Sequence, residues 1–213
     1  MTKEQELFTK IKPLLEGYTE GIYWDFKKSF SDKADIIKDI MAFSNSDYDG
    51  DSYIIFGVSE QNSKKEKITK VKLNIADRKR LNTDASYLYI PNKWVMEGLS
   101  LKDISSLRQA SETLTQTISK NMLISMPKCE FVPIMINKTR WLYVIVVKKT
   151  PGVFISKTDI TREQGEKPIV KQGVIYIRVA DTTMGADTNE ANAVECIRVW
   201  KKYIDWLENK QGA

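Results

Sequence analysis

The sequence predicts a single α+β domain over residues 1–213, built as a mixed sheet flanked by helices. The length of 213 residues suits one sizeable domain with its own core. Hydrophobic residues make up 42% of the chain and aromatic residues 10%, which indicates a packed core rather than disorder. Helical and strand periodicities are interleaved along the chain, without an internal repeat or a low-complexity linker.

The first sixty residues show clear elements. Apolar positions at helical spacing predict a helix over residues 4–16. Residues 22–28 alternate as a half-buried strand does, and this places Asp25 and Lys27 on one face. A second amphipathic helix is expected to end near Asn45, and the apolar run at 52–58 reads as a central buried strand.

The remainder is less regular. The stretch from 59 to 80 reads as a charged loop. Residues 82–100 give no clear prediction, although YLYIPNKWV could be a strand broken by Pro91. A long helix should begin at Ser100, because Asp103 completes a Ser-x-x-Asp start. The other expected elements are a hairpin turning at Asn137–Lys138, a loop at 152–173 and a strand near 173–181 with Tyr176 and Arg178 facing outward. The last expected element is an amphipathic helix at 189–208, whose apolar side carries Ala193, Cys196, Ile197, Trp200, Ile204 and Leu207.

The absence of histidine is the most useful exclusion. It removes Ser-His-Asp and Cys-His nucleophiles, a histidine general base and a histidine-ligated zinc site. Cys129 and Cys196 form no CxxC pair and are expected to be buried thiols in a reducing compartment. Hydrolytic chemistry would then rest on carboxylates, lysines, tyrosines or a carboxylate-bound metal.

Glu20 and Asp25 form the first candidate site. Carboxylates near a lysine can hold Mg²⁺ or Mn²⁺, which neutralises a phosphate and activates water. Lys27 shares the strand face of Asp25 and could contact the phosphate. The same spacing also arises by chance in a chain with 28 acids. Asp25 could therefore lie on a non-catalytic binding surface, or simply pair with Lys27 or Arg178.

Four segments occur together in a recognisable order: EGIYWDFKKS (20–29), IIKDIMAFSNS (36–46), GDSYIIFGVSE (50–60) and GVIYIRVADTT (173–183). In this order the chain resembles the Schlafen-type AlbA domain family. The resemblance covers about residues 15–60 and 125–185, and leaves 61–125 as a family-variable insert with a helix.

This resemblance implies a nucleic-acid-binding fold and, in the animal Schlafens, a metal-dependent ribonuclease with three carboxylates. The matching positions are Glu20, Asp25 and Glu60, with Lys27 beside them and Mg²⁺ or Mn²⁺ as the cofactor. The chain departs from the family pattern in three places. Asp25 replaces a glutamate, the turn before the buried strand has one glycine instead of two, and Glu60 follows Ser59 one position late.

Basic residues form the second candidate site, and the net charge of +5 permits a nucleic-acid partner. Lysine clusters supply phosphate contacts, although a solvated loop explains them equally well. Arg178 belongs to the Tyr-x-Arg pattern of the family, and a structural salt bridge is its alternative role. The predicted nucleic-acid contacts are Lys27, Lys28, Lys64, Lys65, Arg78, Lys79, Arg80, Tyr176 and Arg178.

The expected partner is RNA, either tRNA-like or single-stranded, with DNA as an alternative and a defence or regulatory setting implied by the family. A protein carrying one lobe of the Schlafen groove would complete that groove as a homodimer. The alternatives are a non-catalytic regulatory module and a protein-interaction domain. The longest apolar run, residues 141–147, is too short to span a bilayer, so we expect a cytoplasmic protein with no membrane partner.

Overall fold

The computed structural model describes residues 1–17, 21–60, 69–90, 94–181 and 185–211. The first elements in chain order are α1 (Lys3–Leu15), β1 (Trp24–Lys27), α2 (Lys33–Ser44), β2 (Ser52–Phe56), β3 (Val58–Glu60), β4 (Thr69–Lys72), α3 (Ile75–Leu81), β5 (Tyr87–Ile90) and β6 (Trp94–Met96). They are followed by α4 (Leu101–Asn121), β7 (Lys128–Asn137), β8 (Arg140–Lys148), β9 (Ile160–Thr161), β10 (Pro168–Val170), β11 (Tyr176–Asp181), β12 (Gly185–Glu190) and α5 (Ala193–Gln211).

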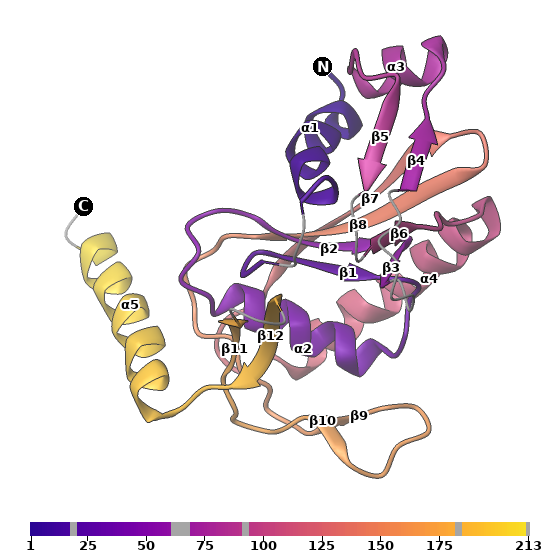
Figure 1. The fold of residues 1–213 in the computed structure, drawn as a ribbon. Helices are drawn as coiled ribbons and strands as arrows, with labels where there is room; N and C mark the ends of the chain where they lie inside the picture. Colours follow the sequence, from indigo (N-terminus) through magenta and orange to yellow (C-terminus); the bar gives the residue numbers. More distant parts are fainter. Residues whose placement is uncertain (18–20, 61–68, 91–93, 182–184, 212–213) are drawn as a thin grey trace.

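A four-stranded mixed sheet lies at the centre, in the order β1-β2-β8-β7 (Figure 1). β1 runs parallel to β2, whereas β8 is antiparallel to both β2 and β7. The β7–β8 hairpin turns where Asn137 pairs with Arg140, as the sequence predicts. The α+β class and the mixed sheet flanked by helices are therefore confirmed.

The two faces of the sheet carry separate cores. On one face α1 and the β4–β5 ribbon cover the sheet, and Tyr53 and Ile55 of β2 join that core. On the other face α2 and α4 pack against Ile54 and Phe56. Because alternate residues of a strand point to opposite faces, β2 contributes to both cores and is buried along its whole length.

Several sequence predictions are corrected. Residues 69–81 form β4 and α3 instead of a loop, because Val71 and Leu73 are buried and Asn74 and Asp77 form a capping box. The predicted loop at 152–173 contains β9 and β10. The stretch before Ser100, for which the sequence gives no clear prediction, contains β5 and β6.

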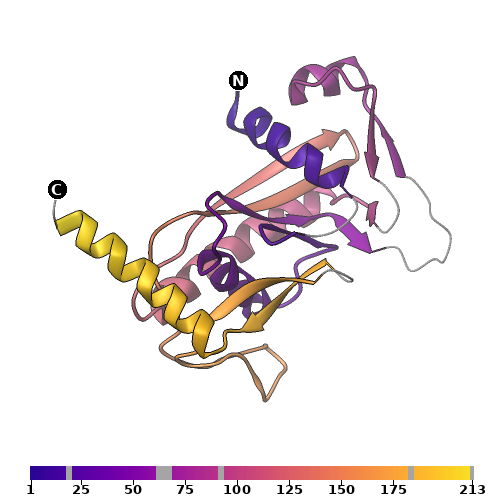
Figure 2. The same ribbon diagram turned by 60° about the vertical axis from the view of Figure 1, so that its left-hand side comes forward.

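The last strand and the last helix also differ from expectation. Alternation predicts that Tyr176 and Arg178 face outward, yet they are 0% and 8% exposed, because β11 packs against α2 and pairs with β12. In α5 the side chains of Ile197, Trp200 and Ile204 are exposed. Both views show α5 extending away from the central sheet (Figure 2).

Candidate functional site

Asp25 and Lys27 lie on the α2 side of the central sheet. Strand alternation places Trp24 and Phe26 against the core under α1, and therefore turns Asp25 and Lys27 toward α2. β11 packs on α2 and brings Arg178 to the same place. The face shared by Asp25 and Lys27 is the one that the sequence predicts.

The side chains form a closed cluster of ion pairs. Asp25 binds the Arg178 guanidinium through Oδ1 at 2.8 Å and the Lys27 ammonium through Oδ2 at 2.7 Å. Lys27 also contacts Asp39 Oδ2 at 3.1 Å, and the Thr188 hydroxyl donates to Asp39 Oδ1 at 2.9 Å. Two acids and two bases thus neutralise one another, and each carboxylate oxygen has a partner.

Burial dominates the electrostatics of this cluster. Burial raises the pKa of Asp39, and the Lys27 ammonium opposes that shift. Burial alone would lower the pKa of Lys27, but the charges of Asp39 and Asp25 outweigh it, so this pKa is raised. The Arg178 side chain is 3% exposed and stacks over the Phe43 ring with its Cζ 5.1 Å from the centroid. Both Asp25 pairs offered as structural alternatives by the sequence, with Lys27 and with Arg178, are present.

Sequence reasoning missed Asp39 and Thr188. Asp39 carried a usable signal, because it lies three residues after Ile36 and four before Phe43, inside the apolar stripe of α2. A carboxylate in a buried stripe needs a cationic partner. Thr188 offered no comparable signal, because its role depends on how β12 pairs with β11.

The described part of the predicted metal site does not fit a divalent ion in this arrangement. Glu20 lies outside the described residues, and Glu60 is described only by its backbone pairing with Trp94. The third predicted ligand, Asp25, has both oxygens engaged by cations. Among the described residues there is no group of three or more acids or cysteines placed to hold a metal.

Two other predicted contacts have ordinary structural partners. The Tyr176 hydroxyl accepts from the Lys171 backbone amide at 2.8 Å and donates to the Ile169 carbonyl at 3.3 Å. The exposed Lys28 pairs with Glu97 at 3.2 Å. Tyr176 is thus an internal brace, whereas Lys28 keeps its side chain at the surface.

An exposed ribbon forms where the sequence predicts only a charged loop. In the antiparallel β4–β5 pair, Lys70 lies opposite Tyr89 and Lys72 lies opposite Tyr87. All four side chains are exposed on one face, while Val71, Leu88 and Ile90 point into the core. Lys70 lies 5.5 Å from the centroid of the Tyr89 ring.

The ribbon continues into a basic hollow of about 680 Å³ between β4, α3 and the β7–β8 turn. Lys72, Arg78, Tyr87 and Lys138 line it. Within the described chain, Lys70, Lys72 and Lys138 make no ion pair. Among the described residues, therefore, no acid pairs with these three lysines to neutralise their charge.

The other predicted basic residues differ in their surroundings. Arg80 is structural, because its guanidinium binds Asp77 at 2.9 Å and the Met135 carbonyl at 2.8 Å, which ties α3 to β7. Lys79 is exposed on α3. Lys64 and Lys65 lie outside the described residues.

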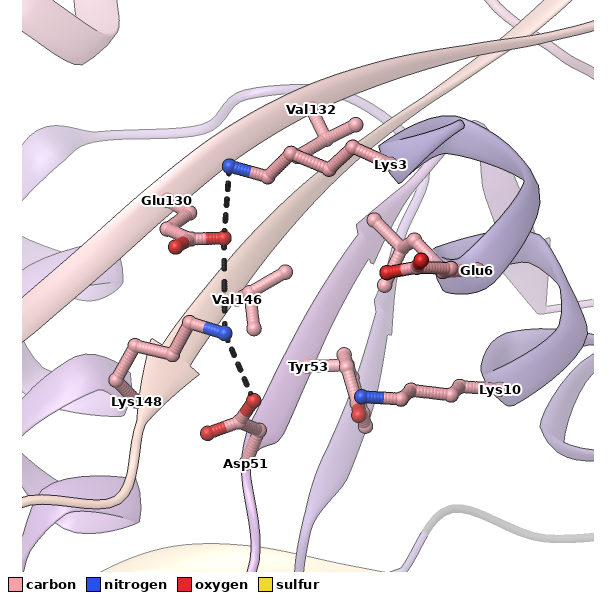
Figure 3. Close-up of a pocket in the computed structure, with 10 residues that line it drawn as sticks. Lys3, Glu6, Lys10, Asp51, Tyr53, Glu130, Val132, Val146 and Lys148 are labelled. Carbon is pink, nitrogen blue, oxygen red and sulfur yellow. Dashed lines mark hydrogen bonds and ion pairs between the residues drawn. The ribbon is translucent and has the colours of Figure 1, made fainter. Parts of the chain in front are cut away.

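A second hollow, of about 440 Å³, lies between α1 and the sheet (Figure 3). Lys3, Glu130, Lys148 and Asp51 form a chain of ion pairs along its wall, with distances of 2.9, 3.6 and 2.9 Å. Burial, followed by the charge of Asp51, raises the pKa of Tyr53 to about 12. The lysines that line this hollow, Lys3, Lys10 and Lys148, are balanced by the acids Glu6, Asp51 and Glu130, so it is a poor match for a polyanion.

Comparison with known proteins identifies a family and a distantly similar structure. The family described as "Schlafen, AlbA_2" matches residues 20–187. No curated protein matches the chain. The solution structure of the N-terminal domain of a RecG-related protein from Nitrosomonas europaea, described as an ATP-dependent DNA helicase relative, is 14% identical, with a TM-score of 0.42, over 86% of this chain and 94% of that one.

A membrane-spanning helix needs about 20 consecutive apolar residues. Within the described residues, no helix is both long and apolar enough to cross a bilayer.

Proposed function

Because the chain belongs to the Schlafen, AlbA_2 family, we propose that it binds single-stranded nucleic acid through the β4–β5 ribbon. The observation that carries this proposal is a pair of cross-strand Lys–Tyr neighbours on one exposed face, with Lys70 opposite Tyr89 and Lys72 opposite Tyr87. Aromatic rings can stack on unpaired bases while the adjacent ammonium groups contact phosphates.

The basic hollow extends the same interface. Lys72 and Tyr87 belong to both the ribbon and the hollow, so a strand lying on the ribbon reaches Arg78 and Lys138 without leaving the surface. Lys79 adds an exposed charge on α3, the helix that carries Arg78. RNA is the first ligand to test, because the family resemblance implies it, and single-stranded DNA is the second.

The buried cluster has a structural role in this proposal. Asp25 and Arg178 hold β1 against β11, and Lys27 and Asp39 join β1 to α2. The pairs are formed between charges of opposite sign inside the protein, so little net charge remains for phosphate.

The test measures binding of labelled single-stranded RNA by fluorescence anisotropy over a series of salt concentrations. A Lys70→Ala/Lys72→Ala variant should weaken binding and flatten the slope of log K against log [salt] by about 1.4, or about 0.7 for each phosphate that the variant no longer neutralises. A Lys102→Ala/Lys120→Ala variant of α4 changes the net charge equally at exposed positions and serves as the matched control. Equal losses in both variants would contradict the ribbon as the interface.

We propose, as a second candidate favoured by the family match, a carboxylate-dependent endoribonuclease in a defence or regulatory setting. It requires Glu20 and Glu60 to converge on an Asp25 released from Lys27 and Arg178. Labelled tRNA would be incubated with Mn²⁺, Mg²⁺ or EDTA. Metal-dependent cleavage that disappears in folded Glu20→Gln and Glu60→Gln variants would support this candidate, and intact RNA under all conditions would reject it.

We also propose that the binding unit is a homodimer. One chain supplies one ribbon, and two copies would offer a longer track for a nucleic-acid strand.

A further inference from the structure

α5 has two faces of different character. Val199 is buried, and Cys196 and Tyr203 pack beside it on the small core formed with β11. Arg198 adds an ion pair to Asp47 at 2.7 Å. These contacts attach one side of the helix to the body of the protein.

The opposite side of α5 is apolar and uncovered. Val194, Ile197, Trp200 and Ile204 are 75%, 66%, 38% and 48% exposed. They recur every three or four residues and so form one continuous stripe along the helix. A continuous stripe of large exposed apolar side chains marks an interaction surface. From this pattern we infer that α5 packs, antiparallel, against α5 of a second copy of this chain.

The charges of the stripe identify the second copy as the partner. Lys201 lies within the stripe, and Asp205 and Glu208 follow one and two turns later. None of these three side chains makes an ion pair with another residue of the described structure. Their charges are complementary to the same surface turned by 180°, because Lys201 of each copy then lies beside Asp205 and Glu208 of the other.

The same charges select the antiparallel orientation. A two-fold axis between Lys201 and Ile204 stacks Ile204 on the aliphatic part of Lys201. It brings Ile197 level with Glu208 of the second copy, one position from Leu207. In a parallel pair equivalent residues would meet, and Lys201 would face Lys201 and Glu208 would face Glu208. Like charges at these positions disfavour that arrangement.

The size of the surface predicts a reversible dimer. A helix of 19 residues is about 28 Å long at about 1.5 Å per residue. A single helix pair of this length falls below the roughly 800 Å² per partner of standard interfaces. We therefore expect a monomer–dimer equilibrium that shifts with protein concentration. This inference names a surface for the homodimer and does not depend on nucleic-acid binding.

The experiment measures molar mass by light scattering on the full chain, without nucleic acid, over a range of concentrations. The wild-type mass should rise from 24.5 kDa toward twice that value. An Ile197→Glu/Ile204→Glu variant should stay monomeric at every concentration. An unchanged circular dichroism spectrum would show that the variant retains the fold. An unchanged RNA affinity through the β4–β5 ribbon, measured per chain at low protein concentration, would support the same conclusion.

A charge exchange tests the geometry. Lys201→Glu alone and Asp205→Lys alone should each weaken dimerisation, because each places like charges across the antiparallel pair. Because Glu208 also lies beside Lys201 of the second copy, the triple variant Lys201→Glu/Asp205→Lys/Glu208→Lys exchanges all three charges and should restore it. A wild type that is monomeric throughout, or a dimer that persists after Ile197→Glu/Ile204→Glu, would overturn the inference. Failure of the triple variant to recover would overturn the antiparallel arrangement.

Discussion

Asp25 shows that one sequence pattern can fit two different roles of a carboxylate. Its spacing from Glu20 and its place beside Lys27 match a phosphodiesterase site, but a strand residue that faces a helix can also be an internal ion-pair partner. The deciding residue, Arg178, lies 153 positions away along the chain. Sequence periodicity predicts the correct face for Asp25, but it cannot show what covers that face.

Replacing Asp25 by alanine should lower the free energy of unfolding by about 3–5 kcal/mol, because a buried guanidinium loses its carboxylate. The measurement is chemical denaturation followed by circular dichroism. Glu97→Gln, which removes the exposed pair with Lys28, is the control and should cost less than about 1 kcal/mol. A similar loss for both variants would show that the cluster is not effectively buried.

Lys149 provides a pH-dependent signature. Its half-buried ammonium donates to the Ser46 carbonyl at 2.8 Å, and burial together with nearby Lys202 lowers its pKa from 10.5 to about 8. Between about pH 8 and pH 10.5 the Lys149 amine is mostly protonated in the unfolded chain and mostly neutral in the folded one. The unfolded state therefore binds more protons, and the free energy of unfolding rises with pH across this range. Below about pH 8 both states are protonated and the effect is constant.

The difference between wild type and Lys149→Met isolates this contribution. Denaturant unfolding from about pH 7 to about pH 10 should give a steeper rise of stability for wild type than for the variant. Parallel curves would mean that the amine titrates equally in both states. Exposed Lys157→Met provides a control that removes a lysine without changing this environment.

At the scale of elements, the β4–β5 ribbon shows that a lysine-rich segment predicted as a loop can contain a strand. The lysines of residues 63–72 favour a loop, and the alternation around Val71 is too short to stand out among them. The buried Leu88 and Ile90 of the partner strand complete the pattern, but they lie in a segment for which the sequence gives no clear prediction. Such a short alternation of polar and apolar residues predicts a strand only when the segment that pairs with it is known.

The ribbon tyrosines should contribute affinity that salt does not remove. Tyr87→Ala/Tyr89→Ala should weaken single-stranded RNA binding by about 1–3 kcal/mol for each base that stacks, with little change in the salt slope. Titrations at low and high salt give both quantities. Tyr87→Phe/Tyr89→Phe keeps the rings and should retain most of the affinity, and an equal loss in this variant would point to the hydroxyls instead of stacking.

α5 shows that a helix can be predicted correctly while its buried side is not. Its amphipathic pattern predicts a helix, and the helix is present. The same pattern also predicts that Ile197, Trp200 and Ile204 face the core beside Cys196. Cys196 does pack there, with Val199 and Tyr203, whereas the other three are exposed. Apolar residues occupy both sides of this helix, so periodicity alone could not choose the side that the body covers.

At the scale of the whole molecule, β2 joins the two cores. Ile54 and Ile55 are adjacent and both fully buried, yet Ile54 belongs to the core under α2 and Ile55 to the core under α1. The continuous apolar run predicts β2 as a central strand, and the α+β class follows from such runs. The pairing order of the strands depends on contacts distant in sequence and could not be predicted.

Shared use of β2 should make unfolding a single cooperative transition. Ile54→Ala and Ile55→Ala should each lower global stability by about 2–5 kcal/mol. Native-state hydrogen exchange should show α1 and α2 losing protection together in both variants. Loss of protection in only one helix would indicate two independently unfolding halves.

The cluster around Asp25 also bears on how the protein is made. Asp25, Lys27 and Asp39 leave the ribosome long before Arg178 and Thr188, so the nascent chain holds two acids against one base until its final strands emerge. Burial of these groups is favourable only once all the charges are matched. We expect a chain stalled before residue 178 to be protease-sensitive and one extended beyond residue 188 to become resistant, a transition that pulse proteolysis of ribosome-bound chains would detect. Formation of the buried ion pairs would then depend on the arrival of β11 and β12, which supply Arg178 and Thr188.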